Sequence, residues 1–363
     1  MNNFGLPFVL LGSLKSFKNM EITEKVTNTS HEQVLIARDD ASGYHGIIAV
    51  HSTALGPAVG GTRFWHYESE EEALTDALRL SHGMTYKTAL AGLPLGGGKS
   101  IIIANNSTRN RTALLRAHGR FVETLKGRYI TAEDVGTSPA DMEIVRLETQ
   151  HVAGLIGRSG DPSPFTAGGV FRAIQASNNF LWNTVELSGL TVAIQGCGKV
   201  GYNLAKVLHE SGVRLIVTDV NSDNLSRVVD EFGAETVAPS EIFSVRADVF
   251  APCALGGVIN DETIPQLKVQ IVAGAANNQL LEERHGAALR DRSILYAPDY
   301  VANAGGVLNG CTELLGWQPE YAFSKVMKIY DTVSSILKSA EAQGIPTNLA
   351  ADRLAEDRLR RAD

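Results

Sequence analysis

Residues 191–219 read TVAIQGCGKVGYNLAKVLHESGVRLIVTD, two apolar runs with a complete glycine motif between them. Gly196, Gly198 and Gly201 form a GxGxxG directly after the first apolar run. A helical pattern follows the glycines, and the second apolar run ends at Asp219. This order of strand, glycine turn, helix and strand predicts a βαβ unit of a doubly wound parallel sheet.

Each glycine of the motif meets a different steric need. Gly196 permits a tight turn, Gly198 lets the backbone approach a pyrophosphate, and Gly201 lets the helix pack closely on the strand. The N-terminus of the helix offers unpaired N–H groups to phosphate oxygens. The predicted dinucleotide-binding residues here are Gly196, Cys197, Gly198, Lys199, Val200 and Gly201.

Asp219 indicates which dinucleotide binds. Its carboxylate can accept hydrogen bonds from both hydroxyls of an adenine ribose, and it would repel a 2'-phosphate. NAD is therefore favoured over NADP, although Arg227, a few residues further on, leaves NADP open at this point.

The rest of this half continues the alternation of strands and helices. Apolar runs at 247–252, 269–278 and 293–300 predict further parallel strands, and ligands of such sheets bind outside the carboxyl ends of the strands. The residues at or near these ends that we expect to face the cofactor or the substrate are Cys253, Ala254, Asn277, Asn278 and Asn303.

Composition limits the remaining possibilities. A chain of 363 residues with 44% hydrophobic residues is long enough for two cores, which predicts two domains. A net charge of −7 gives no basic surface for nucleic acid or an anionic membrane. The three cysteines form no CxxC pair, which favours a reducing cytoplasm and indicates neither a disulfide framework nor a metal site. The short apolar stretch near the N-terminus has no basic segment before it, so we expect neither a signal peptide nor a membrane span.

The first half has a mixed α/β pattern. Residues 43–50 predict a strand, 56–65 (GPAVGGTRFW) predict a glycine-rich turn, and 100–104 predict a buried strand. Ser69 is the expected N-cap of an amphipathic helix that Gly83 either ends or kinks. A further helix over 108–125 and a strand over 128–132 complete this block.

Two lysines of this half, Lys87 and Lys99, are the candidate chemical groups. Lys87 is expected just beyond the helix, and Lys99 is expected where a loop of three glycines meets a buried strand. Two ammonium groups in a partly dry cleft would lower each other's pKa. One could stay charged and bind a substrate carboxylate while the other acts as a base, which is the division that an amino-acid dehydrogenase needs.

Several motifs taken together resemble a known family. The segments LGPAVGGTRFW, ALRLSHGMTYK, GLPLGGGKSIII, YITAEDVGTS, GDPSPFTAGGV, FAPCALGGVIN, AGAANNQL and APDYVANAGGV are similar to those of the leucine, valine and phenylalanine dehydrogenases of the glutamate dehydrogenase superfamily. The likeness runs in order from about Met20 to the C-terminus, nearest to the leucine enzymes.

The resemblance implies roles for individual residues. Lys87 would bind the substrate carboxylate, Lys99 would be the base that activates water, and Asp134 would assist proton transfer to and from the amino group. Thr166 would contact the nicotinamide amide. The backbone of Gly56, and the side chains of Asn277 and Asn278, would touch substrate or nicotinamide ribose. The implied reaction is reversible, NAD-dependent oxidative deamination to a 2-oxo acid and ammonia.

Substrate preference follows from the side-chain pocket that the resemblance implies. Ala132 and Val307 would line it, with Leu55 at its mouth, and this set favours leucine, valine or isoleucine. Gly310 stands where the branched-chain enzymes usually have valine, which keeps phenylalanine or tryptophan as the alternative. Glutamate is disfavoured because no cation faces a second carboxylate.

The expected organisation is a two-domain α/β protein. Residues 1–153 would form a substrate and oligomerisation domain, 154–334 a Rossmann-type NAD-binding domain, and 335–363 a helical segment packed back on the first. Residues 1–19 would be a disordered extension, with Met20 as a possible start. The resemblance implies a homo-oligomer, an octamer. A silent NAD-binding regulatory protein is the remaining alternative, but it would have lost the lysines or the acid.

Overall fold

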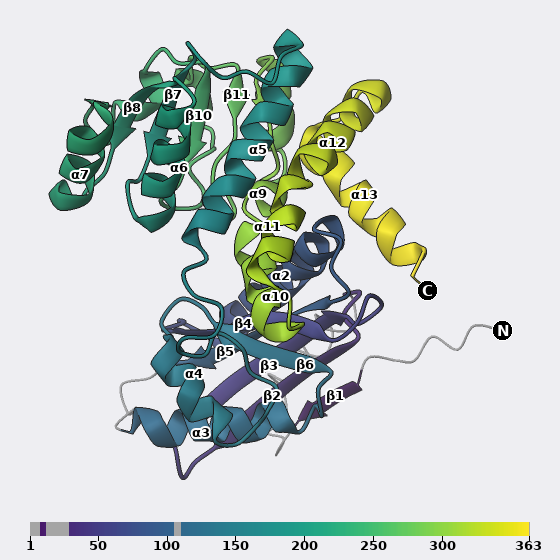
Figure 1. Cartoon of the computed structure of the whole chain (residues 1–363). Coiled ribbons are helices and arrows are strands. Elements are labelled where there is room, and N and C mark those ends of the chain that lie inside the picture. Colours follow the sequence, from purple (N-terminus) through teal and green to yellow (C-terminus); the bar gives the residue numbers. More distant parts are fainter. Residues whose placement is uncertain (1–7, 12–28, 105–109, 363) are drawn as a thin grey trace. The chain divides into compact units, whose positions relative to one another are not determined.

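The structure, a computed structural model, describes residues 8–11, 29–104 and 110–362 and contains two compact α/β units (Figure 1). The described residues up to Gly160, with those from Arg358 on, form the first unit, and Asp161–Asp357 form the second. The predicted fold class, a mixed α/β unit followed by a Rossmann-type unit, is confirmed.

The first unit is built on a mixed six-stranded sheet with the order β1-β2-β3-β5-β4-β6. The strands β4, β5 and β6 run parallel, whereas β3 is antiparallel to both β2 and β5. The strand bounds are Phe8–Leu11 (β1), Gln33–Asp39 (β2), Tyr44–Ser52 (β3), Ala58–Trp65 (β4), Gly96–Ile103 (β5) and Tyr129–Glu133 (β6).

Helices cover both faces of this sheet. On one face, α2 (Glu70–Leu90) buries Leu74 against Ile101. On the other face, α3 (Arg111–Glu123) and α4 (Pro139–Arg146) pack against Ile102. Ile101 and Ile102 point to opposite faces of β5, so they pack into two separate cores.

Ser69 caps α2 as predicted, since its hydroxyl accepts from the backbone N–H of Glu72 at 3.1 Å. The helix does not stop at Gly83, however, but continues to Leu90 and so includes Lys87 in its last turn. A Cβ at Gly83 would meet no neighbouring atom, so this glycine is merely tolerated in the helix.

The prediction of a turn at 56–65 was wrong for most of that segment, because Ala58–Trp65 form β4, an inner strand of the sheet. Its glycines allow close strand contact: a Cβ at Gly60 would lie 1.8 Å from the carbonyl oxygen of Gly98. Likewise Lys99 lies inside β5, because the glycines before it are strand residues and not a loop.

The second unit contains a parallel six-stranded sheet with the order β12-β11-β10-β7-β8-β9. The chain leaves β7 toward β8 on one side and returns to β10 on the other, so the topological switch point lies between β7 and β10. The bounds are Thr191–Gln195 (β7), Arg214–Thr218 (β8), Glu235–Thr236 (β9), Val249–Pro252 (β10), Ile271–Val272 (β11) and Leu295–Tyr296 (β12).

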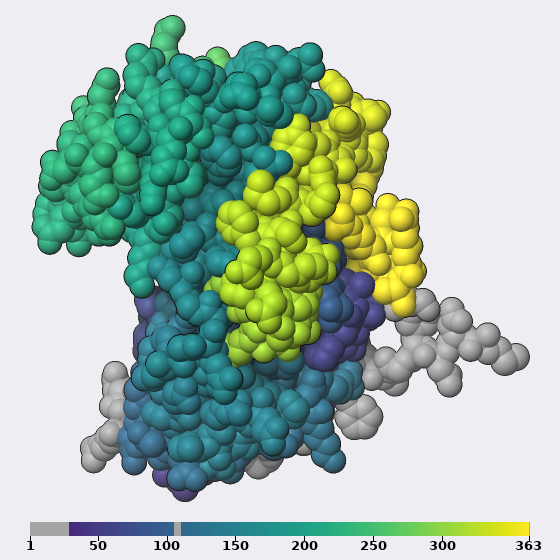
Figure 2. Space-filling view, viewed as in Figure 1, coloured from purple at the N-terminus to yellow at the C-terminus, as the bar shows by residue number. Residues whose placement is uncertain are grey.

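Helices surround this second sheet, and the long α5 packs against α6, α10, α11 and α12. In the space-filling view the yellow-green atoms of α10 and α11 and the yellow atoms of α12 adjoin the teal atoms of α5 (Figure 2). The bounds are Ser163–Trp182 (α5), Lys199–Glu210 (α6), Ser222–Phe232 (α7), His285–Asp291 (α8), Asp299–Ala302 (α9), Gly305–Leu314 (α10), Pro319–Met327 (α11), Ile329–Gln343 (α12) and Thr347–Arg360 (α13).

The unit boundaries differ from the expected ones at the C-terminal end. Residues 335–357 belong to the second unit, and the chain joins the first unit only from Arg358, which donates to the carbonyl oxygens of Ala89 and Leu90 at 2.8 Å. Phe8–Leu11 form a strand, while the other residues of 1–19 and the alternative start at Met20 lie outside the described residues. No helix in the described ranges is long and apolar enough to cross a membrane.

Candidate active site

Lys99 and Asp134 form a largely buried ion pair in the first unit. Lys99 Nζ donates to Asp134 Oδ2 at 2.5 Å, and the side chains are 7% and 25% exposed. Lys99 projects from the middle of β5, and Asp134 follows the end of β6. Thr137 holds the turn after β6, because its hydroxyl accepts from the backbone N–H of Asp134 and donates to the carbonyl oxygen of Thr62.

Burial and nearby charges shift the pKa values of both Lys99 and Asp134. Burial lowers the pKa of Lys99, and the negative charge of Asp134 only partly offsets this. Burial acts to raise the pKa of Asp134, but the positive charges of Lys99 and Arg63 outweigh it and hold that pKa below its usual range. The pair therefore combines an ionised carboxylate with an amine that loses its proton more easily than a free lysine does.

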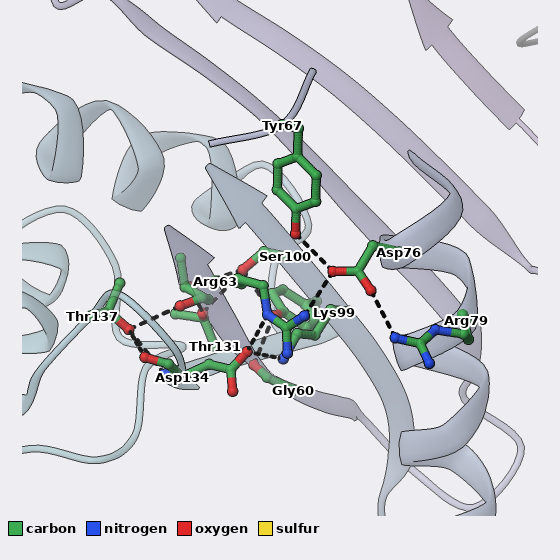
Figure 3. Close-up of polar contacts among 12 residues, drawn as sticks. Gly60, Arg63, Tyr67, Asp76, Arg79, Lys99, Ser100, Thr131, Asp134 and Thr137 are labelled. Atoms are coloured by element: carbon green, nitrogen blue, oxygen red, sulfur yellow. Dashed lines mark hydrogen bonds and ion pairs between the residues drawn. The ribbon is translucent and has the colours of Figure 1, made fainter. Parts of the chain in front are cut away.

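The nearby cation that the structure adds to this pair is Arg63, which the sequence reasoning missed. Its Nε donates to Asp134 Oδ2 at 3.2 Å, and its Nη1 donates to Asp76 Oδ2 at 2.8 Å. Figure 3 shows the guanidinium between the two carboxylates, with Tyr67 on the same oxygen of Asp76 as Arg63 and Arg79 on the other oxygen. An arginine inside a run of glycines and apolar residues was the available signal.

The glycines around Lys99 make room for protein. A Cβ at Gly97 would lie 2.0 Å from the backbone nitrogen of Thr85 on α2, and one at Gly98 would lie 2.7 Å from the ring of Tyr129. A Cβ at Gly61 would lie 2.7 Å from the Cβ of Asp134. On the face of the sheet that carries Lys99, the close approach of α2 at Gly97 and of Asp134 at Gly61 removes water from Lys99, which explains the desolvation.

A polar layer supports the same strands from the opposite face of the sheet. The hydroxyl of Thr62 lies 2.5 Å from that of Thr131 and 2.8 Å from that of Ser100, and the Tyr129 hydroxyl donates to the Gly60 carbonyl oxygen at 2.7 Å. These fully buried bonds link β4, β5 and β6 and keep the strands that carry Lys99 and precede Asp134 in register.

Other predicted residues of the first unit lie around the start of β5. The contact of Gly97 with α2 places the last turn of that helix, with Lys87, beside the strand that carries Lys99. Gly56 has a φ of +140°, donates from its N–H to the Thr53 carbonyl oxygen and accepts from Gly96. Leu55 precedes it in the same loop, and Ala132 lies opposite Gly61 in the strand register.

In the second unit the glycine motif lies at the switch point. A Cβ at Gly201 would lie 1.9 Å from the carbonyl oxygen of Gly196, and Gly196 has a φ of +98° with Ala254 packed against it. Gly198 differs, since a Cβ there would meet no protein atom within 4 Å and its φ of −63° suits any residue. The space that Gly198 leaves is thus open to a ligand.

The cradle for a pyrophosphate is completed by α6, which begins at Lys199 with Val200 next and has no side-chain cap. Asp219 stabilises the turn, because its Oδ2 accepts from the backbone N–H of Cys197 at 2.6 Å and its Oδ1 accepts from that of Asn221 at 2.7 Å. Each carboxylate oxygen retains a lone pair for a ribose hydroxyl. These residues fit a dinucleotide.

The loops after β10 and β11 lie beside this cradle. The Cβ of Cys253 would be 3.6 Å from a Cβ at Gly201, and a Cβ at Gly256 would lie 2.5 Å from the carbonyl oxygen of Asn277. Asn303, at the end of α9, donates to the side chain of Asn277 at 2.8 Å. Asn278 is exposed and has a φ of +52°.

Thr166, Val307 and Gly310, the residues of the second unit expected at the nicotinamide and the side-chain pocket, lie on α5 and α10, which pack against each other. Thr166 lies in the first turn of α5, and a Cβ at Gly306 would be 3.1 Å from its hydroxyl. Val307 follows on α10, half-buried, and a Cβ at Gly310 would meet nothing within 4 Å. The described residues include no group of His, Cys, Asp and Glu able to hold a metal ion.

Comparisons with known proteins agree with this fold. Residues 28–151 match the model of the Glu/Leu/Phe/Val dehydrogenase dimerisation domain, and residues 217–363 match the Glutamate/Leucine/Phenylalanine/Valine dehydrogenase model. The chain is 52% identical to leucine dehydrogenase of Geobacillus stearothermophilus, over 94% of both chains, and 50% identical to L-tryptophan dehydrogenase of Nostoc punctiforme, over 94% of this chain and 96% of the relative. The crystal structure of L-tryptophan dehydrogenase from Nostoc punctiforme superposes with a TM-score of 0.85 at 49% identity, covering 94% of this chain and 99% of that one.

Proposed function

Because the chain belongs to the Glu/Leu/Phe/Val dehydrogenase family, we propose that it catalyses the reversible, NAD-dependent oxidative deamination of a branched-chain L-amino acid. The substrates are the amino acid, NAD and water, and the products are the 2-oxo acid, ammonium, NADH and one proton. The observation that carries this proposal is the largely buried pair of Lys99 and Asp134, which supplies a base and a second group that can take up and return a proton.

Each residue has a defined task in this proposal. Lys87 binds the substrate carboxylate through its ammonium group. A bound NAD would supply the acceptor for the hydride that leaves Cα of the amino acid. Lys99, once deprotonated, takes a proton from water as the water oxygen bonds to the iminium carbon. Asp134 takes a proton from the substrate ammonium before hydride transfer and later returns it to the amino nitrogen. The hydroxyl of the hydrated intermediate then gives its proton to solvent as the carbon–oxygen double bond forms, the carbon–nitrogen bond breaks and ammonia leaves.

Three features of the second unit support NAD as the cofactor. The open space at Gly198 and the uncapped start of α6 suit a pyrophosphate, and the carboxylate of Asp219 disfavours a 2'-phosphate. The guanidinium of Arg227 already has other partners, because it stacks 3.6 Å from the centre of the Tyr202 ring and pairs with Glu231. Arg227 is therefore not held ready to bind such a phosphate. Thr166, Cys253, Ala254 and Asn303 complete the proposed cofactor contacts.

A branched-chain substrate is supported by the leucine dehydrogenases among the relatives and by the small apolar Ala132 and Val307 of the proposed pocket. One observation favours a second candidate, an aromatic amino acid. Among the described residues, no atom lies within 4 Å of a Cβ placed on Gly310, and a tryptophan dehydrogenase is 50% identical to this chain.

The test is a panel of kcat/KM values for leucine, valine, isoleucine, phenylalanine, tryptophan and glutamate with NAD, and for the 2-oxo acids with ammonium and NADH. We expect the branched-chain substrates to lead. Preference for an aromatic substrate would indicate that Gly310 sets the size of the side-chain pocket. Inactivity toward every amino acid would support the silent NAD-binding protein instead.

We further propose that the protein is a homo-oligomer, an octamer, assembled through the first unit. The match of residues 28–151 to a domain described as a dimerisation domain supports self-association. Light scattering of the purified protein measures the number of subunits directly, and a monomer would contradict the proposal.

A further inference from the structure

Arg63 occupies an unusual place for an arginine. It lies on β4, an inner strand, its side chain is 21% exposed, and its guanidinium joins two carboxylates from different elements. One is Asp134 after β6, at 3.2 Å, and the other is Asp76 on α2, at 2.8 Å. A buried cation needs such partners, but two partners with defined geometry also fix the orientation of the guanidinium.

Asp76 is itself held in place. Its Oδ2 accepts from the Tyr67 hydroxyl at 2.7 Å as well as from Arg63, and its Oδ1 accepts from Arg79 at 3.1 Å. The chain of contacts therefore runs from a helix, through Asp76 and Arg63, to the carboxylate of Asp134 (Figure 3). Arg63 cannot turn away from Asp134 without leaving Asp76.

Both cations bind the same oxygen of Asp134. Lys99 Nζ lies 2.5 Å from Oδ2 and Arg63 Nε lies 3.2 Å from it, so neither cation binds Oδ1. A carboxylate with one oxygen bound by two cations has a fixed rotation about its Cβ–Cγ bond. Its second oxygen then keeps one direction, as a group that must hand a proton to a substrate nitrogen requires.

We propose that Arg63 is a positioning residue of the deamination, which fixes the Asp134 carboxylate so that Oδ1 serves proton transfer while Oδ2 stays with Lys99. This inference rests on the proposed role of Asp134. Arg63 is not a catalytic residue in this scheme, because it acts through Asp134 and does not touch the substrate.

A double-mutant cycle separates positioning from a purely structural role. The variants are Arg63→Ala, Asp134→Asn and the combination, with kcat and KM measured for each. Arg63→Ala should lower kcat about 100-fold with KM for NAD unchanged, and it should cause little further loss once Asp134 is already Asn. Equal losses in both backgrounds, or a wild-type kcat for Arg63→Ala, would overturn the proposal. Wild-type turnover by Asp134→Asn alone would instead refute the proposed function.

The surroundings of Arg63 permit a second test by chemical rescue. A cavity of about 520 Å³ adjoins Arg63, Asp76 and Val135, so the volume vacated by Arg63→Ala is open to solvent. Millimolar methylguanidinium should restore part of the kcat of Arg63→Ala and leave the wild type unchanged. The matched control is Arg116→Ala, which removes an arginine paired with Glu148 on the same unit and should keep full activity.

If Arg63→Ala does not fold, Arg63→Lys carries the test. A lysine keeps the positive charge but cannot fork between two carboxylates, so kcat should still fall about 10-fold and the acidic limb of the pH profile should shift. Wild-type kcat together with an unshifted pH profile in Arg63→Lys would show that charge alone suffices and would overturn the positioning role.

Discussion

The two glycine clusters of this chain look alike in sequence and differ in structure. In the first unit, Gly97 and Gly98 leave no free space, because α2 and Tyr129 fill the volume that a Cβ would take. In the second unit, Gly198 has no protein neighbour at that position. Gly97 and Gly98 thus serve packing, because protein occupies the place of a Cβ, whereas Gly198, within the glycine motif before an uncapped helix, leaves space for a ligand.

Two half-buried aspartates, Asp134 and Asp352, differ in how their surroundings treat a negative charge. Asp134 in the first unit lies between Lys99 and Arg63, and its pKa is lowered. Asp352 on α13 of the second unit accepts from the Tyr300 hydroxyl, and burial, with nearby acidic groups such as Glu283, raises its pKa to about 6. The first unit thus stabilises a negative charge where the second unit disfavours one.

The strongest test of the first unit's charged site is Lys99→Ala. Removing the base should lower deamination about 1,000-fold while NAD binding, measured by NADH fluorescence, stays intact. In the wild type, burial lowers the pKa of Lys99, so the rise of kcat/KM with pH should have its midpoint below the ordinary lysine value of about 10.4. Wild-type turnover in Lys99→Ala would break the assignment of the site to this unit.

The packing role of the first unit's glycines is tested by Gly97→Ala. The new Cβ would meet the Thr85 backbone, so we expect a loss of about 3 kcal/mol in the free energy of unfolding or failure to fold, seen by thermal denaturation. Gly83→Ala is the matched control on α2: its Cβ meets nothing, and it should stabilise the helix by about 0.5–1 kcal/mol. Equal melting temperatures for the two variants would contradict this account.

The ligand role of the second unit's open glycine is tested by Gly198→Ala. This variant should fold with an unchanged melting temperature, because no protein atom opposes the methyl group. It should bind NAD about 10-fold more weakly, since the methyl group would stand where the pyrophosphate approaches. Titration calorimetry with NAD measures the change, and unaltered affinity would place the phosphates elsewhere.

The smallest expected effect concerns Asp352. Its folded pKa of about 6 exceeds the unfolded value of about 3.9, so the folded state holds the proton more tightly and stability falls as pH rises between these values. Asp352→Asn removes this dependence and can still accept from Tyr300. Between about pH 5 and about pH 7.5 the wild type should lose about 1 kcal/mol relative to the variant. If the free energies of unfolding of the wild type and of Asp352→Asn changed in parallel with pH, the pKa of Asp352 would not be raised in the folded state.

Sequence reasoning found the second unit more completely than the first. The GxGxxG predicted its βαβ unit because a local motif contains every glycine that the turn requires. In the first unit β4 was taken for a turn, because Gly60 and Gly61 are needed by strands distant in sequence. Arg63 was missed for the same reason, since its partners Asp76 and Asp134 become neighbours only when the sheet forms.

The bond from the Cys197 N–H to Asp219 bears on any attempt to redesign coenzyme preference. The Asp219 carboxylate, which would discriminate against a 2'-phosphate, also stabilises the glycine turn through its bond to the Cys197 N–H. Replacing Asp219 with a smaller neutral residue would remove the repulsion and, with the same atoms, release the turn. An engineered switch to NADP would therefore need a second substitution that stabilises the turn again. Without it, the affinity for both coenzymes would fall.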